Sequence, residues 1–265
     1  MNCKKTHAHR IKMNRVLLVT FAVPEELDTA KVYDAIRKCR NGENRKESKI
    51  TRLSDRIFSL RKTNEVVVVS TGIGKLDSYI KLKDAIATVL DKFGKDTRLT
   101  VLNVGTAASI GAPVGTVCEC GRFIERDLIR VGYGKLDDYT IYTVDGTPRF
   151  LSEMDDRPDE CLGDQGYMFG YSCNSGDSFV TDAEKAHQMR DGWTAVCDME
   201  AFSQARIVSE SKGMFLHPVE FRCVKYITDK IDGENSIETW EEELPAARME
   251  LTRQTISSVK DFFRS

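Results

Sequence analysis

Two acidic residues end apolar runs in the second half of the chain, and both have the chemistry to handle a sugar or a proton. Glu200 follows residues 194–199 where a helix should begin, and Asp229 follows residues 224–228 just past a strand. Ligands of open α/β sheets bind outside the carboxyl ends of the strands. Carboxylates placed there accept hydrogen bonds from hydroxyl groups or transfer a proton. Asp229 is equally suited to cap a turn at residues 230–233.

A third carboxylate lies near the N-terminus. Glu26 belongs to the sequence Pro-Glu-Glu, which follows the apolar run 15–22. Acidic groups at the start of a helix interact favourably with its dipole, so capping explains this glutamate without any function. The alternative is a carboxylate in the crevice of the sheet that activates water.

Three small-residue segments also follow strand-like runs. Residues 72–75 read Gly-Ile-Gly-Lys, but Asp77 stands where a dinucleotide fingerprint needs its third glycine. Residues 105–109 are small and include Thr106, so backbone N–H groups there can approach a ligand closely. Phe179 ends the segment 175–179 and could stack on a planar ring. Tight turns and core packing explain all three segments equally well.

The elements that must position these residues alternate along the chain. Apolar runs predict strands, helical spacing predicts helices, and a hairpin is possible within 41–62. Gly94 is a plausible helix C-cap, and Pro245 should break or kink the last helix. The pattern predicts one domain with a mostly parallel sheet and helices on both faces. The strands are expected at 15–22, 65–70, 98–104, 115–120, 139–144 and 168–174, and the helices at 25–38, 76–93, 182–190, 200–212 and 236–263.

Composition excludes several classes of protein. The net charge of −2 over 265 residues argues against a nucleic-acid binder that neutralises phosphates. No apolar run approaches the roughly 20 residues that span a bilayer, so no membrane partner is expected. Residues 1–14 are basic and polar without an apolar core, which predicts a flexible extension rather than a secretory signal. The eight cysteines include no Cys-x-x-Cys pair. We therefore expect reduced thiols, a cytoplasmic protein and no metal site.

Taken in order, these motifs resemble the purine nucleoside phosphorylase/uridine phosphorylase superfamily, especially its 5′-methylthioadenosine/S-adenosylhomocysteine nucleosidases. The resemblance runs from about residue 15 to 263 and rests on residues 22–26, 70–75, 103–107, 175–179, 196–200 and 227–229. It implies one domain over residues 15–265: a three-layer α/β/α structure whose central mixed sheet is partly barrel-like. It also implies a homodimer or larger assembly, a purine nucleoside substrate, a place in methionine salvage, and no cofactor.

The resemblance further implies a role for each matching residue. Glu200 would accept hydrogen bonds from the ribose hydroxyls while Met199 packs on the sugar. Asp229 would protonate purine N7, supported by Thr228, and its pKa should be raised by burial. Glu26 would activate the attacking water. The other matching residues are Phe179, which would stack on the base, Val180, whose backbone would read the base edge, and Thr106 and Ala107, which would line the sugar site.

The nucleophile distinguishes two enzymes with this fold. Hexameric phosphorylases carry arginine where this chain has Asn103, and glycine and arginine where it has residues 24–26. A glutamate repels a phosphate dianion but accepts a proton from water, so hydrolysis is favoured over phosphorolysis. A non-catalytic nucleoside-binding protein is a third reading, although binding alone needs neither Glu26 nor Asp229. The 5′ substituent and the base stay open, because residues 125–160 match poorly; Tyr133 is a candidate for that region.

Overall fold

The structure is a computed structural model that describes residues 13–41, 50–53, 56–59, 64–128, 140–143, 148–150, 169–180, 194–231 and 236–265. Its strands are β1 (Asn14–Phe21), β2 (Ile50–Leu53), β3 (Arg56–Ser59), β4 (Asn64–Ser70), β5 (Thr97–Ser109), β6 (Val117–Glu125), β7 (Thr140–Thr143), β8 (Pro148–Phe150), β9 (Phe169–Ser175), β10 (Thr194–Asp198) and β11 (Glu220–Lys230). Its α-helices are α1 (Thr29–Asn41), α2 (Lys75–Phe93), α4 (Ala201–Ser211) and α5 (Ser236–Arg264), and its short 3₁₀ turns are η1 (Pro24–Glu26), η2 (Arg126–Leu128) and η6 (Lys212–Met214).

The sheet has an open part and a closed part that share β5. In the open part β1 lies between β4 and β5, parallel to both, and the β2–β3 hairpin pairs with β4. In the closed part β5 pairs with β11, β11 with β6, β6 with β9, β9 with β10, and β10 returns to β5. This ring of five strands contains both parallel and antiparallel pairs. The predicted mixed, partly barrel-like sheet is therefore confirmed.

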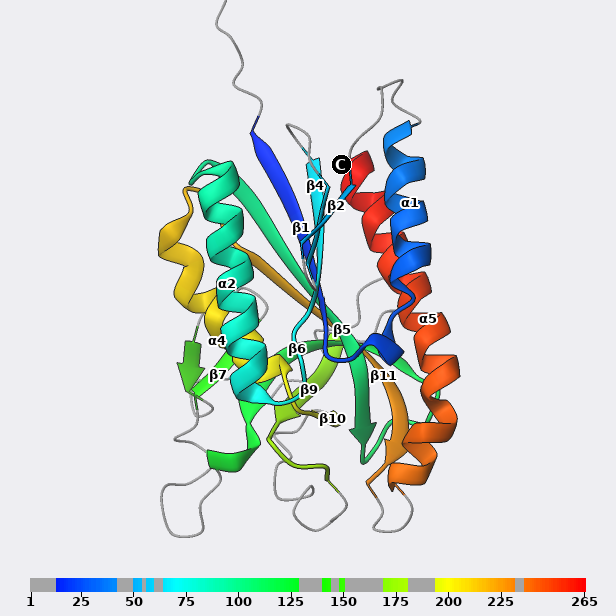
Figure 1. Cartoon of the computed structure of the whole chain (residues 1–265). Coiled ribbons are helices and arrows are strands. Elements are labelled where there is room, and N and C mark those ends of the chain that lie inside the picture. Colours follow the sequence, from blue (N-terminus) through cyan, green and yellow to red (C-terminus); the bar gives the residue numbers. More distant parts are fainter. Residues whose placement is uncertain are drawn as a thin grey trace, which may run out of the picture.

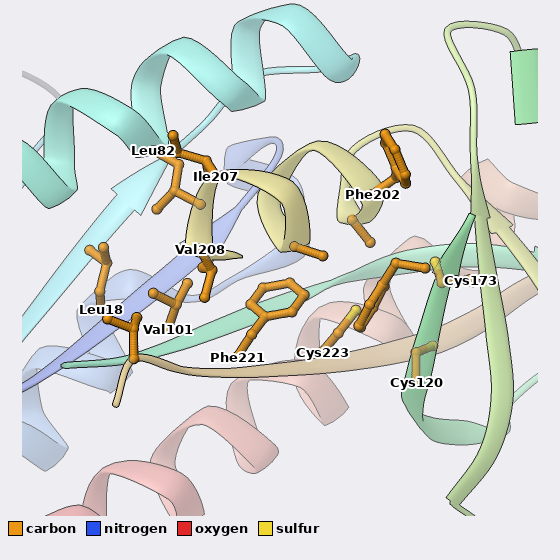
Figure 2. Packing of buried hydrophobic residues seen from close by; sticks show 14 of the residues in the cluster. Leu18, Leu82, Val101, Cys120, Cys173, Phe202, Ile207, Val208, Phe221 and Cys223 are labelled. Atoms are coloured by element: carbon orange, nitrogen blue, oxygen red, sulfur yellow. The ribbon is translucent and has the colours of Figure 1, made fainter. Parts of the chain in front are cut away.

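Two pairs of helices cover opposite faces of this sheet, as Figure 1 shows: α2 with α4 on one side, and α1 with α5 on the other. Because side chains alternate along a strand, β1 serves both layers. Val16 and Leu18 pack toward α2 and α4, whereas Leu17 and Val19 pack toward α1 and α5. Figure 2 shows the first layer. There the rings of Phe123 and Phe221 meet edge to face with their centroids 5.0 Å apart.

Several predicted boundaries were wrong. Pro24 begins the 3₁₀ turn η1, and the first α-helix starts only at Thr29. The segment 105–109, expected as a loop, continues β5 because β11 pairs with it as far as Ser109. The last helix is assigned without a break through Pro245. By contrast, Gly94 does cap α2: its φ is 80° and its N–H donates to the carbonyl of Leu90.

The buried face of α2 leaves out two of its large apolar side chains. Leu76 is 69% exposed and Ile80 is 47% exposed. The helix instead packs through a different set of residues, Ser78, Leu82, Ala85, Ile86 and Val89. Leu76 follows closely after Ile73, which lines the cavity described below.

Some expectations fall outside the described residues, including the helix at 182–190, Tyr133 and most of the extension 1–14. None of the described helices is long and apolar enough to cross a membrane. Within the described ranges, no three His, Cys, Asp or Glu side chains are grouped to hold a metal ion. The described cysteines are free thiols, and five of them are buried.

Candidate active site

A cavity of about 250 Å³ opens where the carboxyl ends of several strands meet, which is where ligands of α/β sheets bind. Its walls come from segments far apart in sequence: the β1–η1 connection, β5, the ends of β10 and β11, η2 and the start of α5. All nine residues singled out from the sequence line it, namely Glu26, Thr106, Ala107, Phe179, Val180, Met199, Glu200, Thr228 and Asp229. The tertiary structure thus gathers the whole predicted set into one cavity.

Glu26 is buried and fixed by four donors. Its Oε2 accepts from the backbone N–H groups of Ala22, at 3.0 Å, and Val23, at 3.3 Å. Its Oε1 accepts from Thr106 twice, from the backbone N–H at 2.8 Å and from the hydroxyl at 2.9 Å. The Thr106 hydroxyl in turn accepts from Trp240 Nε1 at 3.2 Å. Glu26 therefore caps the η1 turn and also lines the cavity.

Thr228 and Asp229 reach the cavity through an irregularity in β11. The register between β11 and β5 shifts between Ile227 and Asp229, so that Ile227 pairs with Ala107 and Asp229 with Ala108. A bulge of this kind re-aims side chains, and here two consecutive residues both line the cavity. The Thr228 hydroxyl lies 2.8 Å from Asp229 Oδ1 and donates to it. Asp229 is 1% exposed, so its carboxyl group is shielded from bulk water.

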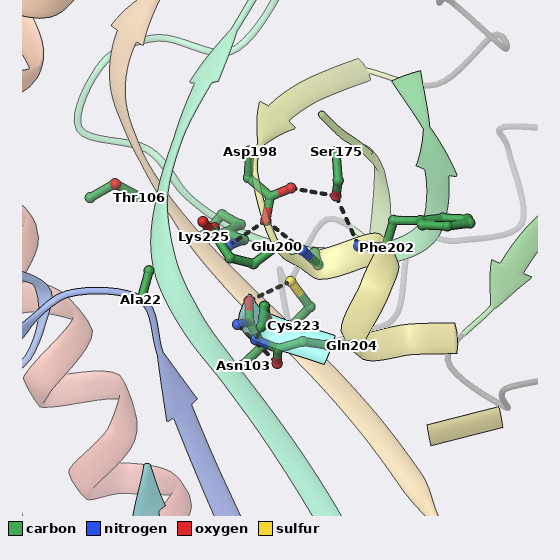
Figure 3. Close-up of polar contacts among 12 residues, drawn as sticks. Ala22, Asn103, Thr106, Ser175, Asp198, Glu200, Phe202, Gln204, Cys223 and Lys225 are labelled. Carbon is green, nitrogen blue, oxygen red and sulfur yellow. Dashed lines mark hydrogen bonds and ion pairs between the residues drawn. The ribbon is translucent and has the colours of Figure 1, made fainter. Parts of the chain in front are cut away.

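Glu200 stands at the N-terminus of α4, beside a buried ion pair. Its Oε1 accepts a hydrogen bond from the backbone N–H of Gly74 at 3.0 Å. Next to it, Lys225 Nζ lies 2.7 Å from Asp198 Oδ2, and both side chains are 1% exposed (Figure 3). Asp198 also accepts from the Ser175 hydroxyl at 2.5 Å and from the Ala201 N–H at 2.9 Å.

The charges in this cluster shift the pKa values of the two neighbouring acids in opposite directions. Burial, followed by the negative charge of Asp198, raises the pKa of Glu200 to about 8. Burial acts on Asp198 in the same direction, but the ammonium of Lys225 outweighs it and holds the pKa of Asp198 below its ordinary value. The same ion pair raises the pKa of Lys225 against the effect of burial. The neutral form of Glu200 is therefore favoured at neutral pH, beside the ionised Lys225–Asp198 pair.

Gly105 explains how a lysine and a glutamate approach the same strand. A Cβ atom at this position would lie 3.1 Å from Lys225 Nζ and 3.2 Å from Glu26 Oε1. A side chain there would crowd both charged groups, and one of them would have to shift by a few tenths of an ångström. The glycine thus lets the lysine and the glutamate approach this strand closely.

A buried amide network supports the start of α4 from below (Figure 3). The side chain of Gln204 donates to the Ser78 hydroxyl at 2.8 Å and accepts from the Thr20 hydroxyl at 2.7 Å and from Asn103 at 3.2 Å. Asn103 also accepts from the Cys223 thiol at 3.3 Å. Asn103 is thus engaged in the interior and does not line the cavity.

Ion pairs join the segments at the mouth of the cavity. Lys75 Nζ lies 2.8 Å from Glu125 and 2.6 Å from Asp127. The Lys75 backbone N–H donates to Asp177 at 2.7 Å, and the Asp177 N–H donates to Asp127 at 2.9 Å. These contacts fix the segment that carries Phe179 against α2 and η2.

The residues of the site that sequence reasoning missed are Lys225, Asp198, Trp240, Cys197 and Arg126. Of these five, only Lys225 had a signal in the sequence, because it is a lysine inside a strand-like apolar run.

No protein-family model matches the chain, and no curated protein sequence matches it. Solved structures do. The 5′-methylthioadenosine/S-adenosylhomocysteine nucleosidase of Campylobacter jejuni is 17% identical with a TM-score of 0.62, and the match covers 96% of this chain and 100% of that one. The Helicobacter pylori enzyme with butyl-thio-DADMe-Immucillin-A is 16% identical with a TM-score of 0.61, covering 94% and 98%. The Colwellia psychrerythraea enzyme with adenine is 19% identical with a TM-score of 0.55, covering 96% and 97%.

These likenesses extend over almost the full length of both partners. The chain therefore has the fold of the methylthioadenosine/adenosylhomocysteine nucleosidases, as its motifs predicted. At 16–19% identity the fold is what the likeness establishes. The activity has to be argued from the site itself.

Proposed function

We propose that this protein hydrolyses the N-glycosidic bond of a purine nucleoside of the methylthioadenosine or adenosylhomocysteine type, releasing the free base and the ribosyl sugar. The observation that carries the proposal is the cavity that brings Glu26, Glu200 and the buried Asp229 together. The charge pattern of the reaction matches this arrangement. Cleavage develops positive charge on the sugar and negative charge on the base, and groups placed for those charges lower the barrier.

In this scheme Asp229 is the acid that protonates purine N7, and the Thr228 hydroxyl orients its carboxyl group. Phe179 stacks on the base and the Val180 backbone contacts its edge. Glu200 and Met199 hold the ribose, next to Thr106 and Ala107 on β5. Glu26, oriented by its backbone donors, takes the proton of the attacking water.

The charges of the cavity favour water over phosphate as the nucleophile. Glu26 lines it, and Lys225 is already paired with Asp198 at 2.7 Å. A phosphate dianion beside the Glu26 carboxylate would be repelled, whereas water is not. Asn103 is held in the interior network, so it does not replace the arginine of the phosphorolytic enzymes. Phosphorolysis is therefore the second candidate.

Incubating the protein with methylthioadenosine in the presence and absence of phosphate tests this choice. We expect free adenine and methylthioribose at the same rate in both reactions, identified by mass. A sugar 1-phosphate that forms only with phosphate would make the protein a phosphorylase. No base release from methylthioadenosine, adenosylhomocysteine, adenosine or inosine would favour a nucleoside-binding protein.

Ligand binding should depend on pH through Glu200. Its pKa of about 8 favours the neutral form at pH 7, whereas a carboxylate that accepts hydrogen bonds from ribose hydroxyls is favoured in the ionised form. Binding should therefore release a proton, and affinity should rise from pH 6 to about pH 8 and then level off. Calorimetry with a 7-deazapurine analogue, which has no N7 to protonate, measures this in buffers of different ionisation enthalpy.

The control for that measurement is Glu200→Gln. This variant has no titrating group at the position, so its affinity should be weaker and independent of pH over the same range. A wild-type affinity that stays constant from pH 6 to pH 9 would contradict the role of Glu200.

A second copy of the chain is the partner that this proposal includes. Ile73 lines the cavity and is 58% exposed, and Leu76 and Ile80 continue an exposed apolar stripe along α2. Residues at this spacing share one helix face. A homodimer that covers the stripe would also close the side of the cavity next to it. The free, buried thiols suit a reducing compartment, and we place the protein in the cytoplasm.

A further inference from the structure

Arg126 is a buried cation at the cavity that the scheme above does not use. It lies in η2, is 6% exposed and contributes to the cavity wall. Its Nη2 donates a short hydrogen bond to the carbonyl oxygen of Ser178 and lies 3.4 Å from the Ser178 hydroxyl. The guanidinium also borders the thiol of Cys197, where it opposes the rise of that thiol's pKa to about 11 that burial causes. Ser178 and Cys197 flank the part of the cavity assigned above to the base.

None of the described carboxylates forms an ion pair with Arg126. The adjacent Asp127 is paired with Lys75 at 2.6 Å instead. A guanidinium carries five N–H donors and stays charged at any physiological pH. A buried charge is costly unless it is paired. Its charge also acts on Asp127 and on the Cys197 thiol, but no described carboxylate neutralises it by direct contact, so this charge can act on what enters the cavity.

We infer that Arg126 is a catalytic residue that stabilises the negative charge on the departing purine, an inference that rests on the proposed function. As the bond between C1′ and N9 breaks, its electron pair moves into the base. Asp229 gives its proton to N7, the oxygen of water bonds to C1′, and the released proton goes to Glu26. Arg126 neither gives nor takes a proton. It supplies a fixed positive charge in a site shielded from water, where such charges act strongly.

A purely structural role makes a different prediction. Arg126 packs against Gly176, where a Cβ atom would lie 2.5 Å from its Nε, so it also braces the segment that carries Phe179. If Arg126 only held this segment in place, its removal would weaken the binding of every substrate by a similar factor. If its charge stabilises the leaving base, its removal would slow most the substrates whose bases are the poorest anions.

The experiment uses a series of purine nucleosides with one sugar and ring substituents that vary the acidity of the free base. Single-turnover rates of base release are plotted against the pKa of the leaving base for wild type and Arg126→Met. We expect a steeper slope in the variant, with a loss of about 100-fold for the least acidic base, the scale of removing one oxyanion donor. The most acidic base should lose much less. Arg126→Lys keeps a positive charge and should restore part of the slope.

Arg122 provides the matched control. It is another buried arginine, 5% exposed, on β6 just before η2, and it does not line the cavity. Arg122→Met should leave the slope at its wild-type value, whatever it does to stability. A uniform loss across the series in Arg126→Met, or an unchanged slope, would refute the catalytic role and leave the brace. If wild type releases no base from any member of the series, the proposed hydrolysis itself fails, which is a distinct result.

Discussion

Replacing Asp229 by asparagine is expected to lower kcat for purine nucleosides by about 10²- to 10⁴-fold, the range that a positioned general acid contributes. Asparagine has nearly the same shape and can still accept from the Thr228 hydroxyl, which lies 2.8 Å from Oδ1. It cannot deliver a proton to N7. The base would then have to leave as an anion, so the chemical step slows while the cavity keeps its form. Steady-state kinetics with methylthioadenosine measures the loss.

The fold should not change in this variant, and thermal unfolding checks that point. Asp91→Asn makes the same chemical change on the exposed surface of α2 and should leave both kcat and the unfolding midpoint at wild-type values. A kcat for Asp229→Asn within a factor of about three of wild type would rule out Asp229 as the acid.

Replacing Lys225 by methionine should lower the free energy of unfolding by about 3–5 kcal/mol, the typical loss when one partner of a buried ion pair is removed. Lys225 and Asp198 are both 1% exposed and lie 2.7 Å apart, so Asp198 would stay buried without its counter-charge. The uncompensated charge of Asp198 would then act more strongly on the neighbouring Glu200. Because Lys225 lowers the pKa of Glu200, its loss should also hold Glu200 protonated to a higher pH. Urea unfolding at pH 7 measures the stability term.

The double variant Lys225→Met with Asp198→Asn separates the charge from the packing. Removing both charges should recover most of the lost stability, because the asparagine oxygen can still accept from the Ala201 N–H while its NH2 group donates to the Ser175 hydroxyl oxygen. Lys38→Met, which replaces an exposed lysine on α1, should change stability by less than about 0.5 kcal/mol. A double variant as unstable as the single one would show that the aliphatic stem of Lys225, and not its charge, stabilises the site.

Sequence patterns predicted the structure correctly where a single strand or turn determines it. The runs that became β1 and β4 are apolar because both faces of the sheet are covered, and such runs can be recognised in a sequence. The prediction from sequence patterns failed where contact with another segment of the chain determines the structure. The small residues 105–109 resemble a loop, yet β11 and β10 pair with them and extend β5. The apolar residues of α2 resemble a buried face, yet Leu76 and Ile80 remain exposed.

The sequence by itself determined which groups are available: three acidic residues at the ends of strand-like runs, an aromatic side chain after a turn, and their order along the chain. The type and spacing of residues carry that information, because the carboxyl ends of strands in such a sheet meet in one crevice. Only the tertiary structure decided how those acids differ. Asp198 is held ionised because β11 places Lys225 against it, whereas Glu200 is driven toward its neutral form by burial and by that same Asp198. A pKa depends on neighbours in space, and neither the Lys225 contact nor the approach of Arg126 to the cavity can be read from positions along the chain.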